Sequence, residues 1–264
     1  VITAAAALEN GMTTDKSFAA SGGYQAPQTD RVIRNFGGGT CGGDMVDALR
    51  VSCNTYFAQL GAEVGGAALA DTARAFGFTE EPPLDIRAAA AKLPSNEDLR
   101  SPAFAALSAI GQFNVAASPL QMALVAAGIA NEGNVPSPKL VRQIEDARGG
   151  LLDQSRAEVW KRAVSADTAE TIKEMMVGVV EGGTARATAV PGVRVAAKTG
   201  TAQSGATGED TLSWTIAFAP ADSPRIAVAV VVEGRESASN ETGGRIAAPI
   251  VKAVLDAHRS VGRW

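Results

Sequence analysis

Apolar residues recur at helical spacing through the first half of the chain, and strand-like apolar runs replace them near its end. Apolar positions three and four residues apart face one side of a helix. On this basis we expect helices over residues 1–10, 45–50, 55–63, 67–76, 102–110, 120–131, 166–181 and 247–258. The pattern therefore predicts a helical lobe over roughly residues 1–135 and a sheet lobe over roughly 136–264 of a single domain.

Strands are expected mainly in the last third of the chain. Alternating or continuous apolar runs predict them over 193–203, 213–219 and 225–233, with another over 139–144. The short turn Pro220 to Pro224 would join the second and third of these strands in an antiparallel hairpin. Residues 226–232 are too apolar to face water on either side, so this strand is expected at the centre of the sheet.

Capping residues mark several of the expected helix ends. Asp44 and Ser118 each precede a helix, and Ser52 could cap the helix over 55–63. Gly182 and Gly183 would end the helix that begins at residue 166. Residues 11–44 are rich in Gly, Thr and Asn and are predicted to form a loop.

Composition narrows the function classes. The 264 residues are 46% apolar and 20% charged, which is typical of a globular domain. The net charge of -4, with no basic cluster and only 5% aromatic residues, argues against nucleic acid as a partner. The longest apolar runs are shorter than the roughly 20 residues that a membrane span needs. A single histidine, His258, and no cysteine pair at zinc-site spacing leave no metal site or cofactor to expect.

The two cysteines, Cys41 and Cys53, lie close together in the sequence. They could form a disulfide that pins the loop around residue 53, or they could be two free thiols. Spacing in the sequence does not decide between these alternatives, because a disulfide requires a specific geometry.

Two short motifs indicate acyl-transfer chemistry. Lys198-Thr199-Gly200-Thr201 and Ser52-Cys53-Asn54 correspond to the Lys-Thr-Gly and Ser-x-Asn motifs of the serine acyltransferases that recognise penicillin. The third motif of that class, Ser-x-x-Lys, contains the nucleophile. None of the seven lysines has a serine three positions before it.

Further matches follow the same order along the chain, and together they resemble the transpeptidase domain of class B, monofunctional penicillin-binding proteins, of the small actinobacterial type. The matching stretches are 1–11, 52–61, 110–112, 118–123, 183–185, 197–203 and 214–220. The resemblance implies an α+β fold of the penicillin-binding protein and serine β-lactamase type, with an antiparallel sheet flanked by helices.

The resemblance also implies an activity. In this family a serine attacks the penultimate D-Ala carbonyl of a peptidoglycan stem peptide, and an amine of a second stem peptide then takes the acyl group. The family's Ser-x-x-Lys would end immediately before Val1. We therefore expect the nucleophile, and a segment that anchors the protein on the outer face of the bacterial membrane, to lie upstream of Val1.

The resemblance assigns roles on both sides of the site. Lys198 would place positive charge near the substrate carboxylate and the Ser52 hydroxyl, and Ser52 would help to protonate the leaving amine. Asn54 would hold the substrate amide and the missing lysine. Alone, Lys198 could equally be a solvated lysine on a strand, and Ser52 a helix cap.

Gly200 would let the substrate backbone lie against the strand edge as an added strand, and the Thr201 N–H would donate to the oxyanion. The Thr199 and Thr201 hydroxyls could bind the substrate carboxylate, and Gln203 could line the cleft. Without their context, both threonines could be β-branched residues that fill strand positions by propensity.

Two alternatives to a transpeptidase share these motifs. One is a β-lactamase or β-lactam sensor domain, and the other is a catalytically dead domain that binds partners. For a transpeptidase the implied partners are stem peptides, β-lactam antibiotics as inhibitors, and other proteins of cell-wall synthesis.

Overall fold

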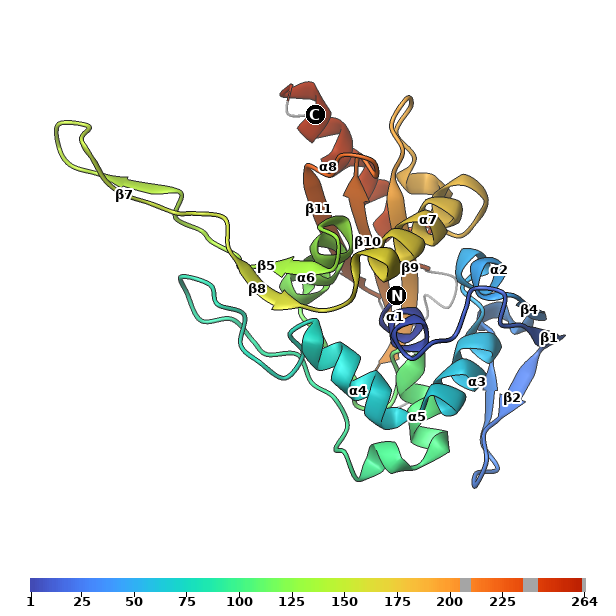
Figure 1. The fold of residues 1–264 in the computed structure, drawn as a ribbon. Coiled ribbons are helices and arrows are strands. Elements are labelled where there is room, and N and C mark those ends of the chain that lie inside the picture. Colours follow the sequence, from blue (N-terminus) through green and yellow to red (C-terminus); the bar gives the residue numbers. More distant parts are fainter. Residues whose placement is uncertain (205–209, 235–241, 263–264) are drawn as a thin grey trace.

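A three-stranded antiparallel sheet positions Lys198 in the computed structural model, which describes residues 1–204, 210–234 and 242–262 (Figure 1). Its strands are β9 (Ala196–Ser204), β10 (Asp210–Ala219) and β11 (Ile226–Glu233), in the order β11-β10-β9. The β10–β11 hairpin predicted from the sequence is confirmed. Lys198 lies opposite Ile216, and Gly200 lies opposite Trp214.

The central position predicted for residues 226–232 is wrong. Among the described residues, β10 is the central strand and β11 is at an edge. The helices α6 (Pro119–Ala130) and α8 (Ala247–Ser260) both pack on β11. The strand is apolar because helices cover its faces, and its apolar sequence carried no information about how many strands flank it.

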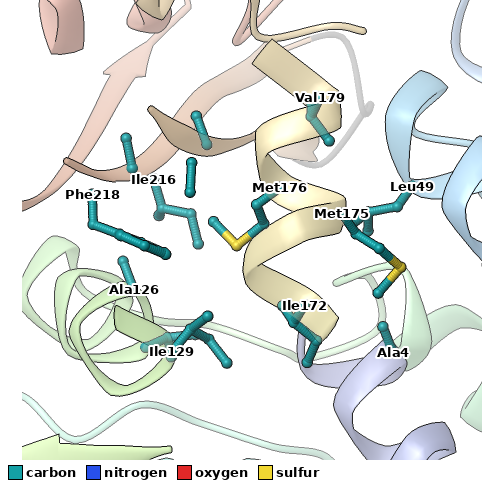
Figure 2. Close-up of a cluster of buried hydrophobic side chains, with 14 of the residues drawn as sticks. Ala4, Leu49, Ala126, Ile129, Ile172, Met175, Met176, Val179, Ile216 and Phe218 are labelled. Carbon is teal, nitrogen blue, oxygen red and sulfur yellow. The ribbon is translucent and has the colours of Figure 1, made fainter. Parts of the chain in front are cut away.

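The core lies between the sheet and α7 (Ala166–Gly182), as Figure 2 shows. Met176 of α7 points toward Ile216 and Phe218 of β10, and Ile129 of α6 lies beside them. The alternate residues of β10, among them Thr215 and the alanines 217 and 219, are also fully buried. Successive strand residues point to opposite faces, so α8, which contacts β10 as well, covers the second face.

Five helices lie in the first part of the chain. They are α1 (Ile2–Glu9), α2 (Met45–Val51), α3 (Asn54–Val64), α4 (Gly66–Ala75) and α5 (Pro102–Ala109). The predicted helices are thus observed, with ends shifted by one or two residues. The division into two lobes near residue 135 stays a prediction, and α6, which precedes that boundary, packs against the sheet. No helix of the described residues has both the length and the apolar character of a membrane span.

Two of the predicted capping residues are confirmed as helix N-caps. The Asp44 side chain accepts a hydrogen bond from the Asp47 N–H, and Ser118 does the same for Gln121. Ser52 is different, because the prediction that it caps the helix after it is wrong. Cys53 occupies that N-cap position, and Ser52 ends α2 in a left-handed conformation (φ 59°, ψ 50°).

Residues 11–44 contain short strands that the loop prediction missed. These are β1 (Phe18–Ser21), β2 (Gly23–Gln25), β3 (Val32–Arg34) and β4 (Cys41–Gly43), with a 3-10 turn at Phe36–Gly38. The pairs are β1 with β4 and β2 with β3. Strands of three or four residues are too short to show a period of two, so their pairing depends on contacts between distant residues.

The strand predicted over 139–144 is only partly right. Strand β6 (Gln143–Glu145) pairs with β7 (Leu151–Gln154), and the two form a hairpin that extends from the body of the molecule (Figure 1). The base of this hairpin is the pair β5 (Asn134–Pro136) and β8 (Val159–Arg162). The remaining short 3-10 turns are Asp98–Arg100 and Arg186–Thr188.

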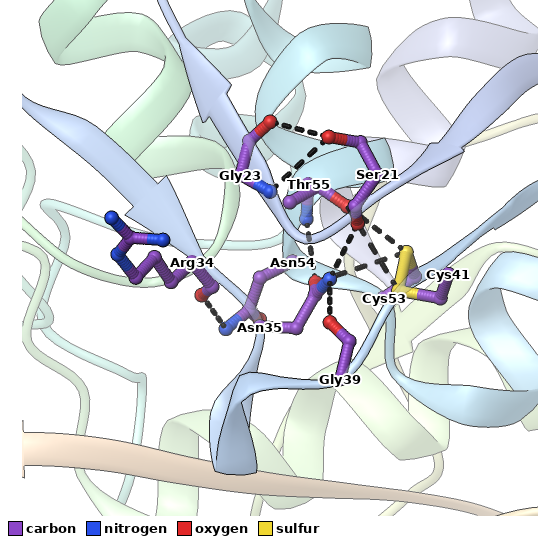
Figure 3. Close-up of a disulfide and its surroundings, with 9 residues drawn as sticks. All are labelled: Ser21, Gly23, Arg34, Asn35, Gly39, Cys41, Cys53, Asn54 and Thr55. Carbon is purple, nitrogen blue, oxygen red and sulfur yellow. Dashed lines mark hydrogen bonds between the residues drawn. A yellow bond between two sulfur atoms is a disulfide. The ribbon is translucent and has the colours of Figure 1, made fainter.

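Cys41 and Cys53 form a disulfide that ties β4 to the start of α3 (Figure 3). The Asn35 side chain strengthens the same junction. Its amide nitrogen donates to the Ser21 and Gly39 carbonyls, each at 2.9 Å, and its oxygen accepts from the Thr55 N–H at 3.0 Å. The disulfide at Cys53 and the Asn35 contact at Thr55 therefore hold the start of α3 against the segment from Ser21 to Cys41.

Truncating Phe218 should destabilise the fold strongly. The side chain, on β10, is fully buried in the main core, so Phe218→Ala should leave a cavity and cost about 3–5 kcal/mol of unfolding free energy. Leu152→Ala, at a residue that is 66% exposed, is the matched control and should cost less than about 0.5 kcal/mol. Urea unfolding measures both, and a Phe218→Ala variant as stable as the control would contradict this core.

Removing the disulfide should also lower stability. The cysteines are 12 residues apart, and a bridge over so short a loop contributes about 3 kcal/mol in the chain-entropy estimate. The double variant Cys41→Ala, Cys53→Ala should lose about that much in urea unfolding. Thiol titration of the unfolded, unreduced wild type should find no reactive thiol, and two reactive thiols would disprove the bridge.

Candidate active site

A cavity of about 430 Å³ lies between the helices α1 and α3 and the strand β9. All seven residues of the two predicted motifs line it, Cys53 as well as the six to which roles or contacts are assigned. These six are Ser52, Asn54, Lys198, Thr199, Gly200 and Thr201. The motifs are separated by more than a hundred residues in the sequence, and the fold brings them to one site. The side chain of Gln203, which follows on β9, lies outside the described part of the structure.

Lys198 joins the two sides of this cavity. Its Nζ donates to the Ser52 Oγ at 2.7 Å and to the Thr199 carbonyl at 2.6 Å. Ion pairs with Asp or Glu, which are common for lysines elsewhere in the described residues, are not recorded for Lys198. Within the described part of the chain, no carboxylate pairs with this ammonium group, so its positive charge acts on the cavity.

Burial lowers the pKa of Lys198 from 10.5 to about 8, because the low-dielectric surroundings disfavour the charged form. The amine is still mostly protonated near neutral pH. A partly desolvated cation acts more strongly on a nearby anion than a cation in bulk water does. The site is therefore suited to hold a carboxylate or to stabilise developing negative charge.

The left-handed backbone of Ser52 is the local feature that places its hydroxyl. A non-glycine residue in this region costs roughly 1–2 kcal/mol, and such residues cluster at functional sites. The Cys53 N–H donates to the Ala48 carbonyl at 2.9 Å, which closes the turn after α2. The next residues start α3, so Ser52 lies between two helices with its Oγ on Lys198.

Asn54 is the first residue of α3 and lines the same cavity. Its Nδ2 donates to the Arg34 carbonyl at 3.1 Å, which orients the amide (Figure 3). Asn35 accepts from the N–H of the next residue, Thr55, and the disulfide holds Cys53 itself. The middle and the end of the Ser-x-Asn motif are thus restrained.

The three residues after Lys198 have distinct surroundings. Thr199 is buried, and its hydroxyl lies 2.6 Å from that of Thr184. A Cβ at position 200 would lie 3.4 Å from the Trp214 Cβ, which is ordinary van der Waals contact. The Thr201 Oγ1 accepts from the Gly243 N–H at 3.4 Å. Strand β9 is the outer strand of the described sheet, on the side away from β11.

Lys198 is the ionisable side chain that lines this cavity in the described part of the chain. His258, near the end of α8, is half-buried and does not line the cavity. Among the described residues, His, Cys, Asp and Glu side chains form no group of three that could hold a metal ion.

Several residues that shape the site were not identified as site residues from the sequence. Asn35 and Arg34 support Asn54 and the disulfide, and Gly243 lies against the strand at Gly200. A Cβ at Gly243 would lie 2.5 Å from the Gly200 oxygen, which only glycine avoids. The Gly-Gly pair at 243 and 244 was the available signal, but glycine pairs are equally common in turns.

Comparisons with known proteins agree with this geometry. The family described as "Penicillin binding protein transpeptidase domain" matches residues 1–256. The chain is 39% identical to the peptidoglycan D,D-transpeptidase PbpA of Mycobacterium tuberculosis over 97% of its length, and 38% identical to PbpA of Mycolicibacterium smegmatis. It spans 53% of each of these relatives, about half of their length.

Solved structures show the same similarity. The ceftriaxone acyl-enzyme of M. tuberculosis penicillin-binding protein A superimposes with a TM-score of 0.92 and 36% identity, covering 97% of this chain and 58% of that one. Its penicillin G acyl-enzyme gives a TM-score of 0.89 and 37% identity, covering 98% and 59%. The predicted fold class is confirmed. This chain belongs to the penicillin-binding protein transpeptidase domain family.

Proposed function

We propose that this domain is part of a peptidoglycan D,D-transpeptidase, which cross-links stem peptides through a serine acyl-enzyme and is acylated by penicillin. The observation that supports this most directly is the 2.7 Å contact between the Lys198 Nζ and the Ser52 Oγ in a cavity lined by both motifs. The similarity to PbpA over nearly the whole chain supports the same activity.

The nucleophilic serine and its lysine are proposed to come from outside the 264 residues, since the sequence contains no Ser-x-x-Lys. Val1 lies in the cavity wall at the start of α1. A serine on a helical turn before α1 would therefore lie close to Ser52 and Lys198. Its Oγ attacks the penultimate D-Ala carbonyl while the lysine takes its proton.

Three residues of this chain then stabilise the developing charges and protonate the leaving group. The Thr201 N–H donates to the oxyanion, and the Lys198 ammonium stabilises the negative charge and attracts the terminal carboxylate. Ser52 passes a proton to the leaving D-Ala amine as the carbon–nitrogen bond breaks. An amine of a second stem peptide next attacks the ester, releases the serine and forms the cross-link.

Substrate binding is assigned to the two faces of the cavity. Asn54 holds the amide on the acyl side, and the hydroxyls of Thr199 and Thr201 bind the carboxylate. The edge of β9 at Gly200 receives the peptide backbone as an added strand, with Gln203 farther along the cleft.

The proposed domain organisation is a helical lobe and a sheet lobe with the cleft between them.

The proposed location is the extracytoplasmic face of the bacterial membrane, because the peptidoglycan substrate lies there. Stem peptides are the proposed partners, β-lactams the inhibitors, and other proteins of cell-wall synthesis further partners. The Cys41–Cys53 disulfide fits a compartment that is oxidising.

A labelled penicillin should acylate the natural full-length protein and remain bound. An adduct with a half-life of hours is expected, and Lys198→Met should slow its formation at least about a hundredfold, as for the loss of a transition-state electrostatic contact. Lys252→Met is the matched control, because that lysine pairs with Asp256 on the surface and should leave the rate unchanged. Gel fluorescence measures the adduct. Turnover within seconds would instead indicate a β-lactamase, and a wild type that is never labelled would indicate a dead domain.

Acylation should also depend on the charge of Lys198. Its pKa of about 8 means that the ammonium is present below pH 8 and is lost as the pH rises through that value. The second-order acylation rate constant should therefore fall about tenfold per pH unit above pH 8, with the residual rate of the neutral form as its floor. Lys198→Met should lack this decrease. A wild-type rate that stays constant between pH 7 and pH 10 would contradict a role for the charge.

A further inference from the structure

Thr184 lies where three segments around the site meet. It follows α7, and its N–H donates to the Arg50 carbonyl at 3.2 Å, two residues before Ser52. Its hydroxyl contacts that of Thr199 on β9 at 2.6 Å. This one residue therefore bonds both to the helix that ends at Ser52 and to the strand that holds Lys198.

Two glycines, Gly183 and Gly244, allow the segments around Thr184 to approach one another closely. A Cβ at Gly183 would lie 2.1 Å from the Arg50 carbonyl oxygen, so a larger residue there would push the two segments apart. A Cβ at Gly244 would lie 2.4 Å from the Thr184 carbonyl oxygen. The backbones of α2 and of the segment before α8 thus lie against the backbone at residues 183 and 184, which fixes where Thr184 lies relative to β9.

The side chain itself is not needed for the core. Thr184 is exposed, whereas its partner Thr199 is 8% exposed. The Thr184 N–H bond to Arg50 and both glycine contacts are made by the backbone, so they do not require a threonine. Among the residues that the structure describes, the Thr184 hydroxyl forms its hydrogen bond with Thr199.

The hydrogen-bonding capacity of the two hydroxyls determines which of them donates when a carboxylate is bound. Each hydroxyl has one proton to donate and can accept two hydrogen bonds. If the Thr199 proton is donated to a bound carboxylate, the bond with Thr184 requires Thr184 to be the donor. Donation by Thr184 would orient the Thr199 proton toward the anion and strengthen its bond, because hydrogen bonds in a chain polarise one another.

We propose that Thr184 is a positioning residue for the substrate carboxylate, which acts by donating to the Thr199 hydroxyl so that Thr199 donates to the anion. This inference rests on the proposed function and adds a specificity residue to it. Thr184 does not line the cavity and is not assigned a contact with the substrate.

Two variants of the natural full-length protein separate the hydroxyl from the rest of the side chain. Thr184→Val keeps the shape and loses the proton, and Thr184→Ser keeps the proton. With benzylpenicillin, Thr184→Val should lower the second-order acylation rate constant about tenfold, as for one lost hydrogen bond, and Thr184→Ser should restore it to within about threefold. With benzylpenicillin methyl ester, which has no carboxylate, Thr184→Val should change the rate less than about twofold.

Thr188→Val is the structural control. The Thr188 hydroxyl donates to the Ala185 carbonyl at 2.8 Å in the same segment, is fully buried, and does not contact Thr199. This variant should lower the melting temperature and leave the ratio of penicillin to ester rates unchanged. Thr184→Val should instead leave the melting temperature unchanged and lower the ratio of penicillin to ester rates.

The outcomes distinguish the two proposals. An unchanged penicillin rate in Thr184→Val, or an equal loss with penicillin and its ester, would overturn the role of Thr184 alone, since the wild type would still be acylated. A wild type that forms no adduct would overturn the proposed function and this inference with it.

Discussion

The hydrogen bond from Lys198 to Ser52 is the interaction on which the site depends. It connects a strand near the end of the chain to the junction between two helices near its beginning. Separate local features position the Ser52 hydroxyl and set the charge of the Lys198 amine. The left-handed turn at Ser52 places the hydroxyl, and burial in the cavity lowers the pKa of the amine while leaving it charged at neutral pH. The proposed chemistry needs this charge next to this hydroxyl.

Holding two flexible side chains at one distance requires rigid supports behind both. On the helical side, the disulfide holds Cys53, and Asn35 holds Thr55 directly after the motif. On the sheet side, pairing with β10 fixes the register of β9, and Gly243 lies against Gly200. Thr184 contacts both sides. The supports are hydrogen bonds, close backbone contacts and a covalent bond, and together they restrain both sides of the cavity.

The sequence predicted the helices and the last three strands because long periodic segments have a strong local signal. It also predicted both motifs of the site, since their spacing and order match a family. Other features depend on contacts between distant residues. The edge position of β11, the short strands between residues 18 and 43 and the left-handed Ser52 are set by tertiary packing, which overrides local preference. The contact of Thr184 with Thr199 joins segments that no local pattern links.

A double-mutant cycle on Ser52 and Lys198 tests the central claim most directly. The acylation rate constant with labelled penicillin would be measured for the full-length wild type, Ser52→Ala, Lys198→Met and the double variant. If the two side chains act as one unit, the double variant should be no more than about threefold slower than the slower single variant. If the two losses multiply instead, the residues act independently, and the account of a single site organised by their hydrogen bond is wrong.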